Sequence, residues 1–292
     1  MTALVYSNTP VGHTSDVEFR AWAQELNDCI VSAGWAQSTD TGQLNIATAV
    51  RPGASTYAGY RVYVDPSSLQ ATFPCFLKIQ FGTGSSATGL QITVQIGTST
   101  NGAGTLTGTL VSPVTTAFAS GVPSSTTTNY PTLLAYKDGY LMVAFKKGAM
   151  FTGVGGFIVA RSMNSSHAVL AETIQLMTRG TSGAPFCHAL NAAPVLSSSR
   201  GSNVCLIPGG QSLTSLVGLD VQVYKHYMSC PRTRCAPYVT TVLQTDVPDD
   251  TTISIALTDA TSHTYRAISG TLGISWGVGD VTANHILAAL WE

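Results

Sequence analysis

Residues 180–185, Gly-Thr-Ser-Gly-Ala-Pro, place a serine among small residues, where its hydroxyl could act as a nucleophile. Such a serine needs a histidine to take its proton and an acid to orient that histidine. His13 and His167 precede Ser182 in the chain, and aspartates lie between the two histidines. However, His13 stands just before a predicted helix and His167 stands in a polar loop, so neither is in the setting of a general base.

The same stretch resembles the Gly-x-Ser-Gly-x-Pro segment around the nucleophile of chymotrypsin-like viral proteases. Those proteases surround their histidine with small residues and a cysteine, and neither histidine here has such neighbours. A short motif without its structural context is weak evidence, and Thr-Ser-Gly-Ala-Pro is ordinary loop chemistry in a chain rich in Ser, Thr and Gly. We therefore predict a turn, no catalytic residue and no enzymatic activity.

Metal and cofactor motifs are incomplete. Cys230 and Cys235 have a spacing that zinc tolerates, but no second Cys/His pair follows, and a reducing cytoplasm favours free thiols. Asp246, Asp249 and Asp250 lack the alternation of a calcium loop. The glycines of residues 153–156 are not followed by the lysine and helix of a phosphate loop. We predict no metal site and no cofactor.

The charges also limit the partners. The formal net charge is −1, and the basic residues are too sparse for a nucleic-acid track. The N-terminus lacks the basic and apolar regions of a secretory signal, and no apolar stretch reaches the roughly 20 residues of a membrane helix. We therefore expect neither nucleic-acid binding nor membrane insertion. A charge-poor surface does favour self-association, so a homo-oligomer is expected.

Composition indicates a mainly β protein. Hydrophobic residues make up 44% of the chain but charged residues only 10%, against roughly 25% in typical soluble domains. Ser, Thr, Asn and Gln supply the remaining polarity, beside 28 glycines. Threonine suits a pleated surface and glycine suits turns, whereas exposed helix surfaces are usually built from Lys, Glu and Arg.

One helix is predicted over residues 16–33. Ser15 and Glu18 have the spacing of a capping box, and Gly34 stands where a helix stop is expected, with Trp35 as a hydrophobic contact across the cap. An apolar stripe recurs at three- and four-residue steps and includes Phe19, Trp22, Leu26 and Ile30. The opposite face carries Arg20, Gln24, Glu25, Asn27 and Asp28. The stripe must dock on the chain's own β-domain or on a neighbour, and we predict that its four named residues form an assembly interface.

Beyond the helix the pattern changes to a period of two. Residues 90–96, Leu-Gln-Ile-Thr-Val-Gln-Ile, alternate apolar and polar, as in a half-buried antiparallel strand. Residues 137–139, Lys-Asp-Gly, between two apolar runs, predict a hairpin. The Ser/Thr-rich stretch 112–131 carries three prolines and is expected to be a long loop. These patterns predict an antiparallel sandwich or barrel with one N-terminal amphipathic α-helix.

Domain boundaries are only weakly marked. Residues 191–201 contain two alanines, a proline and Ser-Ser-Ser-Arg-Gly, which is the best linker candidate. We predict an N-terminal helix and arm over residues 1–50 and a β-rich domain over residues 51–189. Residues 190–292 form either a second β-rich domain or a continuation of the first.

Residues 19–35 and 39–45 resemble the start of a group of uncharacterised virion proteins of tailed bacteriophages, and several later segments are similar to the same proteins. The resemblance covers the first third of the chain well and the remainder loosely. It is carried by residues 19–35, 39–45, 59–63, 76–85, 96–108 and 287–292. The resemblance implies a component of the tail, baseplate or fibre, and it brings no catalytic residues.

These observations lead to two hypotheses. The first is a structural subunit of the virion, made in the bacterial host cytoplasm, which acts through contacts with other virion proteins. The alternative is a receptor-binding module that recognises host-surface glycan through loops between strands. Residues 225–235, which combine aromatic side chains and arginines, are a candidate for such a loop, although a bulky turn is the simpler interpretation. Head decoration is a weaker third option.

Overall fold

The structure is a computed structural model of the 292-residue chain. Nearly all of the described side chains belong to the N-terminal part of the chain, and farther along mainly the strand backbones are described. The described residues are 3–7, 10–11, 15–84, 89–111, 113–119, 128–129, 132–137, 140–146, 154–163, 169–179, 185–191, 205–206, 222–225, 227–230, 233–234, 239–243, 252–256, 262–268 and 285–290.

The predicted helix is α1, Asp16–Ser32, and both of its ends are capped as expected. The Ser15 side chain accepts a hydrogen bond from the Glu18 N–H, and the Glu18 carboxylate accepts one from the Ser15 N–H at 3.0 Å, which completes the capping box. At the other end Gly34 takes a φ of 91°, and the N–H groups of Gly34 and Trp35 donate to the carbonyls of Val31 and Ile30. This is a Schellman motif, which favours glycine because its positive φ is strained for other residues.

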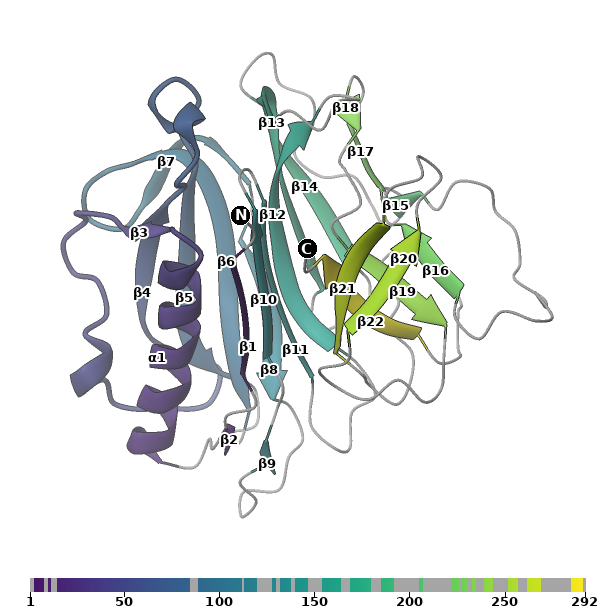
Figure 1. Ribbon diagram of the computed structural model, residues 1–292. Helices are drawn as coiled ribbons and strands as arrows, with labels where there is room; N and C mark the ends of the chain where they lie inside the picture. The colour runs from purple at the N-terminus through teal and green to yellow at the C-terminus, as the bar shows by residue number, and fades with distance from the viewer. Residues whose placement is uncertain are drawn as a thin grey trace.

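The first sheet lies beside α1 and is built from consecutive antiparallel strands (Figure 1). Its order is β3-β4-β5-β6-β7. The strand β8 also pairs with β6, along residues 90–94, whereas β7 pairs with residues 97–100 of β6. The strands are β3 (Ala36–Gln37), β4 (Tyr57–Val64), β5 (Phe76–Thr83), β6 (Leu90–Thr100), β7 (Leu106–Leu110) and β8 (Val114–Ala119). Two 3-10 turns, η1 (Ile46–Thr48) and η2 (Ser68–Ala71), lie in the connections before and after β4.

The second sheet begins with the N-terminal strand and continues with strands from the middle of the chain. Its order is β1-β10-β11-β12-β18-β17-β15, and β13 joins β12 to β14. The strands are β1 (Ala3–Ser7), β10 (Thr132–Lys137), β11 (Tyr140–Lys146), β12 (Val154–Met163), β13 (Val169–Arg179), β14 (Pro185–Asn191), β15 (Cys205–Leu206), β17 (Tyr227–Cys230) and β18 (Thr233–Arg234). Lys137 faces Tyr140 in the β10–β11 pair, which confirms the predicted hairpin.

The remaining strands form a third sheet and a short pair. The third sheet has the order β16-β19-β22-β21-β20, and β2 pairs with β9. The strands are β16 (Gln222–Lys225), β19 (Val239–Leu243), β20 (Thr252–Ala256), β21 (Ser262–Ile268), β22 (His285–Leu290), β2 (Pro10–Val11) and β9 (Thr128–Asn129). Every strand pairing in the described parts of the chain is antiparallel. The mainly β prediction with one N-terminal helix is therefore confirmed.

The first two sheets and α1 share one core. Leu77, Ile79 and Phe81 of β5 lie opposite Ile96, Val94 and Ile92 of β6 and point to the same face. The helix covers part of this inner face, and the second sheet covers the rest through residues such as Val143 and Phe157. In keeping with this, α1 contacts β1, β8 contacts β12 and β13, and β14 contacts β6 and β7. The arrangement is a sandwich in which the helix extends one of the two layers.

The loop expected over residues 112–131 is only partly correct. Val114–Ala119 forms β8 and pairs with β6 from Leu90 to Val94. Its sequence, Val-Thr-Thr-Ala-Phe-Ala, is dominated by β-branched and aromatic residues that fit a pleated surface. The prolines that suggested a loop stand outside this run. The domain boundaries at residues 50 and 189 remain predictions, and no helix in the described residues is long and apolar enough to span a membrane.

Candidate functional site

The four residues predicted as an assembly interface lie inside the chain's own core. Phe19 and Ile30 are fully buried, and Trp22 and Leu26 are 4% and 3% exposed. The Trp22 ring packs edge-on against Phe81 of β5, with the ring centroids 5.8 Å apart. This corrects the interface prediction, because the stripe is already covered by the first sheet of the same chain. The alternative noted for the stripe, docking on its own β-domain, is the arrangement observed.

The polar face of α1 was also assigned incorrectly at one position. Asn27 is 6% exposed, and its side-chain oxygen accepts hydrogen bonds from the Arg61 guanidinium and the Tyr63 hydroxyl. Burial raises the pKa of the Tyr63 hydroxyl, so this group remains a donor across the physiological range. The three side chains join the helix to β4 and satisfy each other's polar atoms, which is why an amide is tolerated in the core.

A second polar group joins two loops, and we call it the clasp. Asp40, in the turn after β3, accepts a hydrogen bond from the Thr100 hydroxyl and another from the Gly104 N–H, both at 2.8 Å. The Thr41 N–H donates to the Gly102 carbonyl, also at 2.8 Å. The turn at residues 39–42 is thereby held against the hairpin loop between β6 and β7. Both segments belong to those that carry the sequence resemblance.

Tyr60 lies beneath the clasp on the outer face of the first sheet. Its hydroxyl donates to the Thr41 carbonyl at 2.6 Å, and its ring lies so close to Gly104 that a Cβ atom there would be 2.0 Å from the ring carbons. The Lys78 ammonium is 4.8 Å from the ring centroid, within cation–π range. Burial lowers the pKa of Lys78, whereas the charge of Asp40 raises it. Tyr60 is therefore held on several sides.

We expect Asp40→Ala to lower the free energy of unfolding by about 1.5–3 kcal/mol, since hydrogen bonds to a charged group contribute about that much. Chemical denaturation monitored by tryptophan fluorescence would measure the change. Thr39→Ala, at the exposed neighbouring position, is the control and should change stability by less than about 0.5 kcal/mol. Equal stability of the two variants would contradict a structural role for the clasp.

Below the clasp, the outer face of the first sheet carries an exposed aromatic ring. Tyr57, at the start of β4, is 37% exposed, and its ring lies over Gly82 of β5, where a Cβ atom would be 2.6 Å from the ring. The Tyr57 hydroxyl is 2.6 Å from the Thr93 hydroxyl, which is 2.9 Å from the Thr115 hydroxyl of β8. Gly82 and these hydroxyls fix the ring against the sheet.

Three glutamines lie on the same face of the sheet as this ring. Gln91 faces Gly82 and Gln80 faces Thr93 across the β5–β6 pairing, and Gln95 faces Lys78. All three glutamines are half-buried, and none donates or accepts a side-chain hydrogen bond within the described residues. We call Tyr57, Gln80, Gln91, Thr93, Gln95 and Thr115 the glutamine–tyrosine face. It presents amide, hydroxyl and aromatic groups and no charge of its own.

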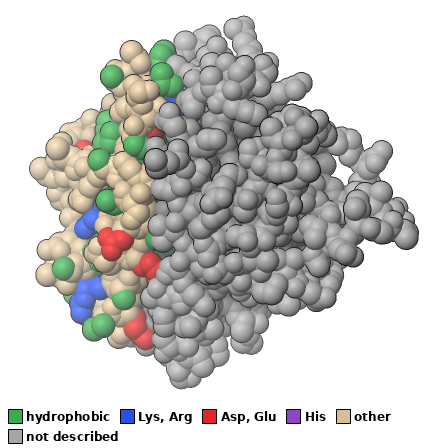
Figure 2. Space-filling view, viewed as in Figure 1, with side chains coloured by type: hydrophobic (Ala, Val, Ile, Leu, Met, Phe, Trp, Pro, Cys, Tyr) green, Lys and Arg blue, Asp and Glu red, His purple; other side chains and the backbone are tan. Residues whose placement is uncertain are grey.

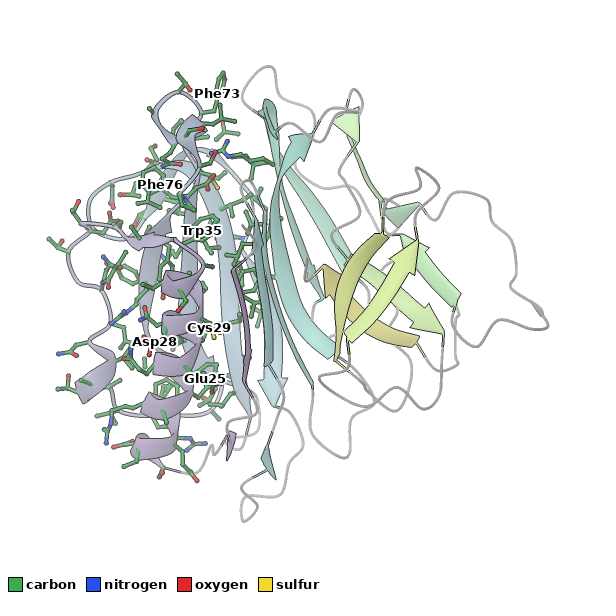
Figure 3. All side chains as sticks on the ribbon, in the orientation of Figure 1. Glu25, Asp28, Cys29, Trp35, Phe73 and Phe76 are labelled. Atoms are coloured by element: carbon green, nitrogen blue, oxygen red, sulfur yellow. The ribbon has the colours of Figure 1, made fainter. Side chains whose placement is uncertain are left out.

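One ion pair is buried between the two sheets. The Arg161 guanidinium of β12 donates to the Asp65 carboxylate from Nε at 2.7 Å and to the Phe73 carbonyl at 2.8 Å. The other Asp65 oxygen accepts from the Ser67 N–H at 3.0 Å. Arg161 is 2% exposed and Asp65 6% exposed, whereas Phe73 lies in the outer loop between β4 and β5 (Figure 3). The pair fixes this loop to the second sheet.

The two cysteines with described side chains, Cys29 and Cys75, are not activated as nucleophiles. Burial, with the negative charges of Glu25 and Asp28, raises the pKa of Cys29 to about 12, and Cys29 lies on α1 beside Glu25 (Figure 3). Burial also raises the pKa of Cys75. A thiolate is the form that attacks substrates or binds metals, so both side chains remain thiols at neutral pH.

Other positions discussed from the sequence lie outside the described residues or have no described side chain. They are His13, His167, Ser182, Cys230, Cys235, Asp246, Asp249 and Asp250. Asp40 and Asp65, which stand between the two histidines in sequence, are both bound to backbone N–H groups in loops. In the part of the chain that the structure describes, no three His, Cys, Asp or Glu side chains are grouped as metal ligands would be.

Sequence reasoning missed the glutamine–tyrosine face, although a signal for it was present. The alternation in residues 90–96 identified Gln91, Thr93 and Gln95 as one face of a strand, and the structure confirms that assignment. The pattern did not predict which strand pairs with this one. It also did not predict that Tyr57, 36 residues away in sequence, covers Thr93. No protein-family model matches the chain, and no curated protein sequence matches it either.

Proposed function

We propose that this protein is a structural subunit of a tailed-bacteriophage particle, in the tail, baseplate or fibre, which acts through protein–protein contacts. The observation that carries the proposal is the clasp. Two of the segments that resemble phage virion proteins, residues 39–45 and 96–108, are distant in sequence, and they are joined through Asp40 and Gly104. These residues therefore hold the fold together, which is expected if the resembling proteins have a similar structural subunit.

The described surface supports self-association. Val17 and Val50 are 66% and 67% exposed, and Val31 is 46% exposed. The Arg51 N–H donates to the Asp16 carboxylate at 2.9 Å, which brings the segment with Val50 to the start of α1 beside Val17. Figure 2 shows hydrophobic side chains beside acidic and basic ones in the lower half of the described surface, and charges of both signs are present there. Exposed apolar residues on a surface with little charge repulsion favour contact between copies.

Two measurements test the proposal. Light scattering coupled to size-exclusion chromatography should give a mass at least twice the 30.5 kDa of a single chain. Mass spectrometry of purified particles of the encoding phage should detect the protein as a stoichiometric component. A monomer at every concentration would contradict self-association, and absence from the particles would contradict a virion role.

The location within the particle separates the remaining alternatives. Cryo-electron microscopy of the particle would distinguish the tail, baseplate or fibre that we propose from head decoration. A receptor-binding module is a second candidate, favoured by the exposed Tyr57 ring and by the glutamines on the same face of the sheet, which have no side-chain hydrogen bond within the described residues. Its chemistry can be tested on the isolated chain.

A further inference from the structure

We propose that the glutamine–tyrosine face binds a neutral glycan. The inference goes beyond a structural role and does not depend on it, because the same face would bind sugar in the isolated chain. It places recognition on the flat of the first sheet, whereas the sequence had suggested loops between strands. Three features of the face carry it: the fixed ring, the unpaired amides and the lack of charge.

The first feature is the Tyr57 ring. A sugar ring has an apolar face of C–H groups that packs well on a flat aromatic surface. Tyr57 offers such a surface without a large entropic cost, because contact with Gly82 on one side and the hydroxyl contact with Thr93 already restrict its rotamer. More than a third of the residue remains exposed to a ligand.

The second feature is the set of amides on the same face of the sheet as the ring. Each glutamine offers two N–H donors and a carbonyl acceptor, and a sugar hydroxyl needs both kinds of partner. Gln91, Thr93 and Gln95 alternate along β6, so their side chains recur about 7 Å apart on one face. Gln80 adds a third amide on the neighbouring strand. In the described residues these amides have no internal partner, so a ligand would not have to displace one.

The third feature is charge. The glutamine–tyrosine face contains no carboxylate, and the cation beside it, Lys78, lies over the Tyr60 ring next to the clasp. An acidic glycan would be expected to meet arginine or several lysines, which the face lacks. A protein partner is also less suited to it, because interface cores are more apolar than these three amides allow. A neutral oligosaccharide fits the composition.

The test uses the full purified chain and an array of neutral oligosaccharides built from glucose, galactose, rhamnose and N-acetylglucosamine. Sialylated and sulfated glycans on the same array serve as charged comparisons. We expect saturable binding to at least one neutral glycan, and then titration calorimetry with that glycan. Tyr57→Ala should weaken binding about tenfold, and Gln91→Ala should weaken it severalfold.

Two further variants keep the result interpretable. Tyr57→Phe retains the ring and should bind within about threefold of the parent chain, which separates ring contact from loss of fold. Gln37→Ala, an exposed glutamine on the edge strand β3, should bind like the parent. The proposal is overturned if no neutral glycan binds, if only the charged glycans bind, or if Tyr57→Ala and Gln91→Ala leave the affinity unchanged. A change in self-association without glycan binding would also overturn it and assign the face to a protein interface.

Discussion

Arg161→Met is expected to lower the free energy of unfolding by about 3–5 kcal/mol, among the largest effects of a single substitution in this chain. The substitution removes one partner of a buried pair and leaves the Asp65 carboxylate, which is 6% exposed, with the Ser67 N–H as its remaining donor among the described residues. It also removes the donor to the Phe73 carbonyl, so the loop between β4 and β5 loses this hydrogen bond to the second sheet. Urea denaturation followed by circular dichroism would measure the loss.

A double-mutant cycle separates the ion pair from packing. Asp65→Asn keeps an oxygen that can accept from the Ser67 N–H but removes the charge. If the pair acts as a unit, Arg161→Met combined with Asp65→Asn should cost clearly less than the sum of the two single changes, with a coupling of about 1–3 kcal/mol. High salt should change the parent's stability little through this pair, because buried charges are weakly screened. A cost below about 1 kcal/mol for Arg161→Met would contradict the role assigned to the pair.

Local sequence patterns predicted local structure well. The capping box at Ser15 and Glu18 and the stop at Gly34 placed α1 to within one residue of its observed end, because both motifs complete their hydrogen bonds inside a few residues. The alternation in residues 90–96 identified the buried face of β6, because successive side chains of a strand point to opposite faces of the sheet. Leu90, Ile92, Val94 and Ile96 are all fully buried.

Long-range polar contacts were not predictable from these patterns. Asn27 was assigned to the exposed face of the helix because an amide is usually solvated, but its partners Arg61 and Tyr63 lie 34 and 36 residues away. Asp65 and Arg161 are separated by 96 residues, and neither has a local motif. The two residues that fix the turn after β3, Asp40 and Gly104, are 64 apart. Such contacts follow from the topology of the sheets, which period and composition do not specify.

The apolar stripe of α1 was ambiguous in a different way. Its spacing shows that one face must be covered, but periodicity contains no information on whether the cover is the same chain or a neighbour. In the structure the inner face of the first sheet is wider than the part covered by the second sheet, and α1 occupies the remainder beside β1. The sandwich therefore uses its N-terminal helix as part of one layer.

We expect Phe19→Ala to cost about 3–5 kcal/mol, because it removes a fully buried ring that lies 5.5 Å from the Trp22 ring, measured between centroids. Thermal unfolding would show a large drop in midpoint with the transition still cooperative. Val17→Ala, on the same helix at a position 66% exposed, is the matched control and should change stability by less than about 0.5 kcal/mol. The contrast tests burial rather than helix propensity, since both substitutions introduce alanine.

Deletion of residues 1–36 extends the test to the whole helix. The truncated chain loses α1 and also β1, the first strand of the second sheet. Because the stripe and the inner face of the first sheet cover each other, we expect the truncated chain to precipitate or to unfold without a cooperative transition. A truncated chain that kept its β-rich spectrum and cooperative melting, and lost only self-association, would contradict the burial observed here. It would restore Phe19, Trp22, Leu26 and Ile30 as an interface between subunits.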